Sequence, residues 1–380
     1  MEINWIIQHF YPETGGAETH AVQISRQLVE RGHEVIVHTS AVTSHREKLP
    51  LTGEFEGIKI QRYRPQINRG YFLSLFAPLL KKGDILVMEG YPSLTNDYVM
   101  RKYRVQFPTV IYPLGVVQAV SGFAAVLRRL YDKVLGIKTL KAANRIVALT
   151  EVERGWYSSK GIDVNKIDII PAGISNEAFE RYDAQIIGQK YGFERYILFI
   201  GRMFHEKAPT DLVRALSKVR NDFKDLGVIF VGPDQGEIVN VKALAKKLGL
   251  EDNIICVGKA SSMEKYEFLA GCEFLVLPSK FEAQGIVFIE AWAQKKAVIG
   301  TKVGGVPYIV KDGETGLLYD HGDINALARH IRFLLENPDK TKMMGKRGFE
   351  IASKEYRWKN IVDRIEKLYS DAIRERGKKV

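Results

Sequence analysis

Short apolar runs alternate with helical patterns along the first half of the chain. Six runs have the length and composition of buried strands: Ile3–Ile7, Val35–Thr39, Ile58–Ile60, Ile85–Met88, Thr109–Tyr112 and Ile146–Leu149. Helical stretches lie between most of them, and after the first run Ala21, Ile24 and Leu28 recur at helical spacing. This alternation predicts a parallel sheet with helices on both of its faces.

The same alternation then starts a second time. The second series of apolar runs comprises Tyr196–Ile200, Val228–Val231, Ile254–Val257, Phe274–Leu277 and Ala297–Ile299. A chain of 380 residues is too long for one hydrophobic core. We therefore predict an α/β protein with two doubly wound domains, residues 1–180 and 181–356. Apolar residues at helical spacing near the end predict a terminal helix over residues 357–380.

Composition places the chain among globular proteins without a membrane span. Hydrophobic residues make up 46% and charged residues 27% of the sequence, and no apolar run is long enough to cross a bilayer. Glu2 stands where a signal peptide has basic residues. These features predict a cytoplasmic protein.

Charge and metal-binding patterns narrow the range of ligands. The formal net charge is +11, and both halves of the chain carry part of the excess, which suits nucleotide phosphates or an anionic membrane surface. No signature of a nucleic-acid-binding module is present. Cys256 and Cys272 lack metal-ligand spacing, and no Asp-x-Asp motif occurs. We expect reduced core thiols, no essential metal and no nucleic-acid partner.

Two glycine-containing motifs follow predicted strands and could bind phosphate. Gly15 and Gly16 come after the first strand and open a helix, so free backbone N–H groups would face an anion there. The alternative is a plain turn. Gly201 and Arg202 follow the first strand of the second series, with Lys207 close behind. These two cations could hold a diphosphate, and the alternative is a solvated basic loop.

A pair of carboxylates follows the strand Phe274–Leu277. Glu282 lies in the loop before a predicted helix, and Glu290 lies about two turns further on. At the carboxyl end of a parallel sheet the two acids could accept hydrogen bonds from sugar or ribose hydroxyls. The alternatives are an ordinary acid at a helix N-terminus and a solvated helix residue. A glycine pair, Gly304 and Gly305, follows the next strand and could equally form a tight turn.

The order of these motifs resembles glycosyltransferase family 4. The resemblance rests on Gly15-Gly16, on Gly201-Arg202 with Lys207, on Pro278-Ser279 followed by Glu282 and Glu290, on Gly304-Gly305 before Pro307, and on Glu314–Leu318. It covers essentially the whole chain and is more specific in the second half. The resemblance implies retaining sugar transfer and the GT-B fold, in which two Rossmann-like domains face each other across a cleft. The terminal helix would cross back to the first domain.

The resemblance also implies roles for individual residues. Gly15 and Gly16 would meet the donor phosphates, and Arg202 and Lys207 would neutralise the diphosphate leaving group. Glu282 would face the transferred sugar and Glu290 the ribose. Further donor contacts are implied for Val257, Gly258 and Lys259 beside the base and for the backbone amides of Gln284, Gly285 and Ile286. The catalytic set would be Glu282, Arg202 and Lys207.

The implied partners are a nucleoside-diphosphate sugar, such as a UDP- or GDP-hexose, and a hydroxyl acceptor that is a saccharide, a polyol or lipid-linked. The family pattern is broken at Leu114, where relatives often carry histidine, and at Ala172, Ala283 and Tyr308. These departures leave two alternatives: a nucleotide-sugar-binding protein without transferase activity, and a GT-B epimerase or phosphorylase.

A separate helical pattern raises the question of membrane contact. Val120, Phe123, Leu127, Leu130 and Val134 form an apolar stripe, while Arg128, Arg129 and Lys133 lie off it. A basic amphipathic helix can lie on anionic lipid. The alternative is a domain helix packed on its own sheet.

Overall fold

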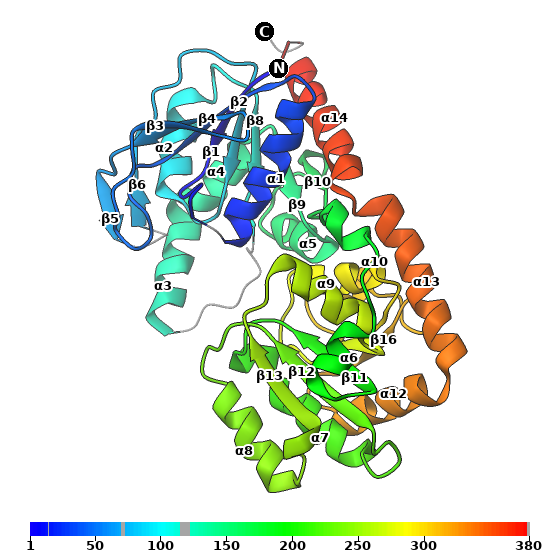
Figure 1. Ribbon diagram of the computed structural model, residues 1–380. Coiled ribbons are helices and arrows are strands. Elements are labelled where there is room, and N and C mark those ends of the chain that lie inside the picture. The colour runs from blue at the N-terminus through cyan, green and yellow to red at the C-terminus, as the bar shows by residue number, and fades with distance from the viewer. Residues whose placement is uncertain (14, 70–72, 115–121, 378–380) are drawn as a thin grey trace. The chain divides into compact units, whose positions relative to one another are not determined.

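The structure is a computed structural model that describes residues 1–13, 15–69, 73–114 and 122–377, with the side chains of 68, 69, 73 and 122–124 also left aside. The chain forms two compact units (Figure 1). Unit 1 comprises Met1–Ala172 with Trp358–Val380, and unit 2 comprises Gly173–Arg357. The domain boundaries expected from the sequence lay at 180/181 and 356/357.

Unit 1 contains a sheet whose described strands follow the order β10-β9-β8-β7-β1-β2-β4-β3. The strands are β1 (Glu2–Ile6), β2 (Glu34–Ser40), β3 (Thr52–Phe55), β4 (Ile58–Tyr63), β7 (Ile85–Glu89), β8 (Thr109–Tyr112), β9 (Arg145–Ala148) and β10 (Ile167–Ile169). Pairing is parallel except between β3 and β4. The predicted parallel sheet is confirmed. The sequence did not predict β3, β10 or the small antiparallel ribbon of β5 (Ile67–Arg69) and β6 (Leu73–Leu75).

The helices of unit 1 cover this sheet. They are α1 (Gly16–Glu30), α2 (Leu94–Tyr103), α3 (Gly122–Tyr131), the π-helical segment η1 (Asp132–Gly136), α4 (Ile137–Ala142), α5 (Glu151–Ser159), the short η2 (Val164–Lys166) and α14 (Trp358–Gly377). The terminal helix α14 buries Ile361 and Ile365 in the same core as β1 and β8. The Tyr369 hydroxyl lies 3.1 Å from that of Tyr112 on β8.

Unit 2 contains a parallel sheet with the order β13-β12-β11-β14-β15-β16. Its strands are β11 (Arg195–Ile200), β12 (Leu226–Val231), β13 (Ile254–Gly258), β14 (Phe274–Leu277), β15 (Ala297–Thr301) and β16 (Leu317–Tyr319). Most strand residues are buried, as expected where helices cover both faces and every strand is a continuous apolar run. The sequence prediction contained each of these strands except β16.

The helical segments of unit 2 are η3 (Asn176–Phe179), α6 (Ile186–Tyr191), η4 (His205–Lys207), α7 (Pro209–Val219), α8 (Ile238–Leu248), η5 (Glu251–Asn253), α9 (Ser262–Gly271), α10 (Ile286–Ala293), α11 (Val306–Ile309), α12 (Ile324–Glu336) and α13 (Pro338–Glu355). The helix α10 is nearly all apolar and is buried, whereas α7 and α12 bury one face only.

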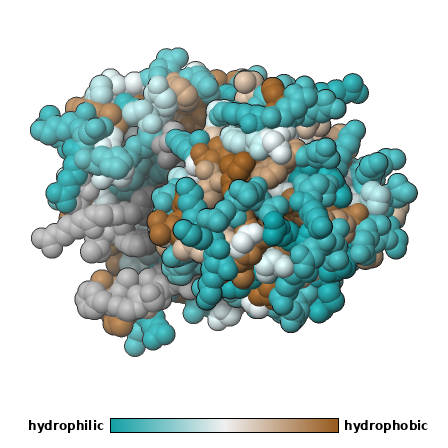
Figure 2. Space-filling view, turned by 60° about the horizontal axis from the view of Figure 1, so that its bottom comes forward, coloured by the Kyte–Doolittle hydropathy of each residue, from teal (hydrophilic) through white to brown (hydrophobic). Residues whose placement is uncertain are grey.

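The surface is mainly polar on the face that Figure 2 shows, where hydrophobic residues gather in small patches. Among the residues that the structure describes, no helix combines the length and the apolar character that a membrane crossing needs.

Candidate functional site

The two strands at the centre of the unit 2 sheet, β11 and β14, lead into Arg202, Lys207 and Glu282 at one edge of the sheet. After β11 the chain first builds β12 and β13 on one side and then β14, β15 and β16 on the other. Open α/β sheets bind ligands at such a switch point, beyond the carboxyl ends of the strands. Arg202 and Lys207 follow β11, and Glu282 follows β14. Residues about 75 positions apart in sequence thus meet at one edge of the sheet.

Lys207 and Glu282 form an ion pair at this edge. The Lys207 ammonium donates to Glu282 Oε1 over 2.6 Å, and the Ser279 hydroxyl donates to the same oxygen over 2.8 Å. Both charged side chains are largely buried, with 21% and 13% of the side-chain surface exposed. Within the described residues Glu282 Oε2 has no hydrogen-bond partner, so it can accept a hydrogen bond from a ligand hydroxyl.

The loop after β15 fixes the backbone of Glu282. Gly304 has a φ of +51°, and a Cβ at this position would lie 2.0 Å from the Glu282 carbonyl oxygen. The amide of Gly305 donates to that oxygen over 2.9 Å, and the Thr301 hydroxyl donates to the carbonyl oxygen of Ser279 over 2.6 Å. The glycine pair therefore supports the loop that carries Glu282.

The guanidinium of Arg202 makes few contacts with other described residues. Its side chain is exposed, and Nη1 makes one long contact of 3.5 Å to Gln235 Oε1. The neighbouring loops are closely joined, because a Cβ on Gly232 (φ +146°) would lie 1.8 Å from the Gly201 carbonyl oxygen. The amide of Gln235 also donates to the Met203 carbonyl over 2.9 Å. The backbone beneath Arg202 is thus held while its fork of N–H donors stays available.

Glu290 is buried and paired with a residue that the sequence reasoning missed. It lies one turn into α10, which begins only at Ile286, rather than two turns in as predicted. Lys265 on α9 donates to Glu290 Oε1 over 2.5 Å, and the Tyr266 hydroxyl lies 3.5 Å from the same oxygen. Burial lowers the pKa of Lys265, but the charges and hydrogen bonds of Glu290 and Tyr266 together outweigh burial, so the pKa is raised. No local pattern marks Lys265, because its partner comes 25 residues later.

Backbone donors surround this part of the sheet edge. Gly285 has a φ of +76° and precedes α10, whose first amides have no acceptor inside the helix. Gln284 beside it is buried, whereas Ile286 is 41% exposed. At the end of β13, Gly258 (φ +84°) accepts a hydrogen bond from the Gly232 amide over 2.7 Å.

The flanking residues of Gly258 are the partly buried Val257 and the exposed Lys259. All three therefore lie at the same edge of the sheet as Arg202.

Gly15 and Gly16 lie at the corresponding switch point of unit 1, after β1, where β2 and β7 diverge. Gly15 is the N-cap of α1 without a side-chain cap, and the space beside Gly16 is open. Glu18 stands in the first turn, and its pKa is raised by burial and by the charges of Glu89 and Glu13. The glycine pair thus lies in unit 1, and the other predicted site residues lie in unit 2.

Metal ligands and thiols contribute little to either edge. Within the described residues no group of three or more His, Cys, Asp or Glu side chains is placed to bind a metal ion. Cys256 and Cys272 are free thiols, and burial raises the pKa of Cys272 to about 12. The candidate site residues described above are Lys, Arg and Glu side chains and backbone amides.

Two doubly wound units, each with a candidate ligand-binding edge at its switch point, define a two-domain α/β protein. The model of the family "Glycosyl transferases group 1" matches residues 183–351, and that of "Glycosyltransferase Family 4" matches residues 14–178. The two models together match nearly the whole chain, which therefore belongs to the glycosyltransferases of group 1 and family 4.

Curated relatives match the chain over nearly its whole length. It is 26% identical over 377 residues to the N-acetyl-alpha-D-glucosaminyl L-malate synthase of Bacillus anthracis, with 96% of each chain covered. It is 24% identical over 397 residues to a D-inositol 3-phosphate glycosyltransferase of Acidothermus cellulolyticus, covering 96% of this chain and 87% of the relative.

Solved structures share the fold. Sucrose-phosphate synthase from Thermosynechococcus elongatus superimposes with a TM-score of 0.77 at 23% identity, covering 97% of this chain and 98% of that one. Anabaena HepE in complex with UDP and glucose gives a TM-score of 0.75 at 17% identity, with coverage of 98% and 100%. The fold is GT-B, as the sequence predicted.

Proposed function

We propose that this glycosyltransferase moves a hexose from a nucleoside-diphosphate sugar to a hydroxyl acceptor, with retention of anomeric configuration. The observation that carries the proposal is the convergence of Arg202, Lys207 and Glu282 at the β11/β14 switch point. Structures of HepE with UDP and glucose and with UDP-glucose support a nucleotide-sugar donor. The acceptor would be a saccharide, a polyol or a lipid-linked hydroxyl.

Charge development explains the residue types. Cleavage of the bond between the anomeric carbon and the phosphate leaves negative charge on the diphosphate and positive character on the sugar ring. Arg202 and Lys207 would stabilise the diphosphate, and Glu282, through its unengaged Oε2, would orient the sugar. In this proposal the acceptor attacks the face from which the diphosphate departs, and the departing phosphate oxygen accepts the acceptor's proton. No residue of the chain then acts as a covalent nucleophile, and no metal ion is required.

The remaining site residues would bind the donor. Glu290 is held through Oε1 by Lys265, and its other oxygen would accept hydrogen bonds from the ribose hydroxyls. The amides of Gln284, Gly285 and Ile286 would add hydrogen bonds to diphosphate and sugar, and Val257, Gly258 and Lys259 would flank the base. From unit 1, the amides of Gly15 and Gly16 would meet the phosphates.

One observation favours a second candidate, a nucleotide-sugar-binding protein without transferase activity. Leu114, the last described residue after β8, stands where the family resemblance implies a histidine, and it adopts a φ of +48° that residues other than glycine rarely take. This candidate predicts donor binding without turnover. An epimerase or phosphorylase would instead show turnover without a sugar acceptor or with free phosphate.

A thermal-shift panel of UDP, GDP, ADP and their sugars, each repeated with EDTA, tests the proposal. Stabilisation by one nucleotide family that is unchanged by EDTA is expected, and Arg202→Ala and Glu290→Ala should abolish it. Arg220→Ala is a matched control, because Arg220 follows α7 away from the site residues. A folded protein that no nucleotide stabilises would contradict the proposal.

The proposal also includes a cytoplasmic location with peripheral contact to an anionic membrane. The membrane contact is supported by the segment from α3 to η1, where Leu127, Leu130 and Val134 of the predicted stripe are exposed instead of packed on the sheet. Val120 lies outside the described residues, as does the side chain of Phe123.

A further inference from the structure

Most of the net positive charge of the chain is concentrated in one segment. Residues 101–145 contain nine Lys and Arg residues and one acidic residue, Asp132, so this segment alone carries a net charge of +8 out of +11. Asp132 is already engaged by Arg128 and by the Tyr91 hydroxyl. Seven of the nine cations lie on α2, α3, η1 and α4 of unit 1.

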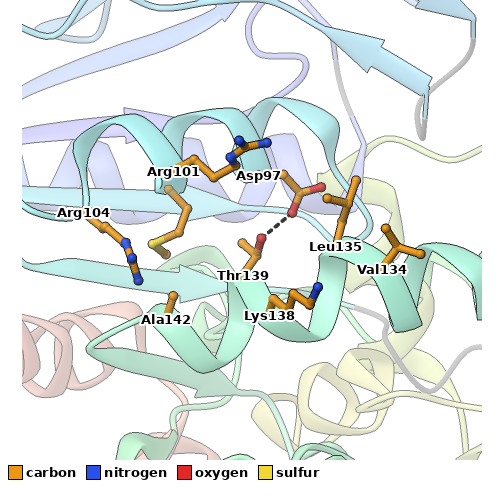
Figure 3. A pocket seen from close by; sticks show the side chains of 9 residues that line it. Asp97, Arg101, Arg104, Val134, Leu135, Lys138, Thr139 and Ala142 are labelled. Atoms are coloured by element: carbon orange, nitrogen blue, oxygen red, sulfur yellow. Dashed lines mark hydrogen bonds between the residues drawn. The ribbon is translucent and has the colours of Figure 1, made fainter.

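A hollow of about 410 Å³ between α2 and the η1–α4 segment collects three of these cations. Figure 3 shows Arg101 on α2, Arg104 directly after α2 and Lys138 on α4, with Val134 and Leu135 at one end of the hollow. The three cationic side chains are exposed, and none of them forms an ion pair or a side-chain hydrogen bond with another described residue. Unpaired cations from two helices around one hollow favour an anionic ligand.

The one carboxylate that lines the hollow, that of Asp97, is hydrogen-bonded to neighbouring side chains of unit 1. Asp97 is buried and accepts hydrogen bonds from the hydroxyls of Thr139 over 2.5 Å and Tyr131 over 2.7 Å. It thereby ties α2 to α3 and α4. Three cations against this single acid leave the lining with a net charge of +2.

An apolar ridge starts at the rim of the hollow. Val126, Leu127, Leu130 and Val134 are 59%, 44%, 59% and 48% exposed, and their spacing places them on one side of the helix. Val134 belongs to both the ridge and the hollow, so the two features are continuous. Arg129 and Lys133 on the same helical segment are exposed as well.

We propose that the hollow lined by Arg101, Arg104 and Lys138 binds the phosphate of an anionic phospholipid while the ridge Val126–Val134 inserts between the lipids. Charge complementarity selects the anion, and the exposed apolar side chains beside it select a bilayer over a soluble phosphate. The proposal rests on the membrane contact proposed above and names the headgroup chemistry and the residues that recognise it. It does not depend on the sugar-transfer chemistry of unit 2.

Flotation of the full chain with two kinds of vesicle tests the proposal. We expect binding to vesicles of phosphatidylcholine with phosphatidylglycerol and little binding to phosphatidylcholine alone. The triple variant Arg101→Gln, Arg104→Gln, Lys138→Gln should bind about a hundredfold more weakly, because each cation near an anionic surface contributes about fivefold. Val126→Ser with Leu130→Ser and Val134→Ser should also release the protein while leaving its charge unchanged.

A charge-matched control separates the hollow from the general charge of the protein. Lys242→Gln, Lys246→Gln and Lys247→Gln remove three exposed cations from α8 in unit 2 and should leave flotation unchanged. Equal loss in this control, or wild-type protein that stays with the soluble fraction, would overturn the proposal. The proposal would also be overturned if the protein did not float but was stabilised by inorganic phosphate or glycerol 3-phosphate, and if the triple variant of Arg101, Arg104 and Lys138 abolished that thermal shift.

The nucleotide thermal shift serves as an independent readout. We expect both triple variants to retain it, because their substitutions lie in unit 1, outside the proposed donor residues. If the wild-type protein shows the nucleotide-induced thermal shift but does not float with the vesicles, the lipid proposal alone is contradicted. If it floats but no nucleotide stabilises it, the donor-site proposal alone is contradicted.

Discussion

Lys207 and Glu282 bring opposite charges to the place where the donor diphosphate is proposed to bind. Without a ligand the ammonium is neutralised by Glu282 Oε1 at 2.6 Å. A bound diphosphate would compete with this carboxylate for Lys207. The pair therefore gives the two residues effects of opposite sign on the binding of a nucleoside diphosphate that carries no sugar.

The first prediction uses that difference in sign. Lys207→Met should weaken binding of the preferred nucleoside diphosphate by about tenfold or more, since a hydrogen bond to a charged group is lost. Glu282→Gln should tighten binding of the same diphosphate, because the competing negative charge is gone, while sugar transfer falls. Titration calorimetry with the sugar-free nucleotide measures both. Weaker binding in both variants would contradict direct competition for Lys207.

The second prediction concerns His38, which is buried in unit 1. The Asn4 amide donates through Nδ2 to the Lys82 carbonyl, so its Oδ1 accepts from His38 Nε2 over 2.9 Å. His38 Nδ1, 2.9 Å from the Tyr63 hydroxyl, then accepts from it. The ring is neutral in this arrangement, and burial lowers its pKa from 6.5 to about 4.

Because the unfolded chain binds the proton more readily, the stabilising effect of the buried neutral ring is fully present above pH 6.5. It is lost as the pH falls toward about 4. The loss amounts to about 3 kcal/mol, at about 1.4 kcal/mol per unit of pKa. Urea unfolding of His38→Gln, which cannot titrate, should show a correspondingly shallower decline between these pH values. Parallel curves for the two proteins would count against a neutral buried His38.

At the scale of elements, the loops after β14 and β15 act together. Gly304 lets the β15 loop approach the Glu282 carbonyl so closely that a Cβ would lie 2.0 Å from it. We predict that Gly304→Ala displaces the Glu282 loop, destabilises the protein by about 2 kcal/mol or more, and abolishes the nucleotide-induced thermal shift. Differential scanning fluorimetry with and without nucleotide measures both effects.

Gly313 provides the matched control for this substitution. It also has a positive φ, +76°, but a Cβ there would meet nothing within 4 Å. Gly313→Ala should therefore cost about 1 kcal/mol for its backbone conformation alone and leave the nucleotide shift intact. An intact nucleotide response in Gly304→Ala would show that the close approach does not position Glu282.

At the scale of the molecule, each unit has its own core and its own candidate edge. Hydrogen exchange measures whether a nucleotide protects the candidate edge of the unit 1 sheet, that of the unit 2 sheet, or both. We predict that the preferred nucleotide sugar slows exchange at residues 201–207 and 279–290 of unit 2 and also near Gly15 and Gly16 of unit 1. Protection of unit 2 alone would remove Gly15 and Gly16 from the donor site, and protection of neither segment of unit 2 would contradict the donor proposal.

Much of this molecule follows from the sequence, because buried parallel strands are continuous apolar runs and their order can be read directly. The two-unit α/β fold and the positions of Arg202, Lys207 and Glu282 after strand ends belong to this part. Strands such as β3 and β16 were not predicted, because β3 is mostly exposed and polar and β16 has only three residues.

Tertiary structure decided the partners. The pairs Lys207–Glu282 and Lys265–Glu290 exist because the sheet order places β14 beside β11 and packing places α9 beside α10. The hollow of Arg101, Arg104 and Lys138 likewise depends on α2 lying against α4. The sequence by itself determines which segments form strands and helices, through the local periodicity of apolar residues. Only the fold determines which distant charges meet, because their distance in space depends on sheet order and helix packing.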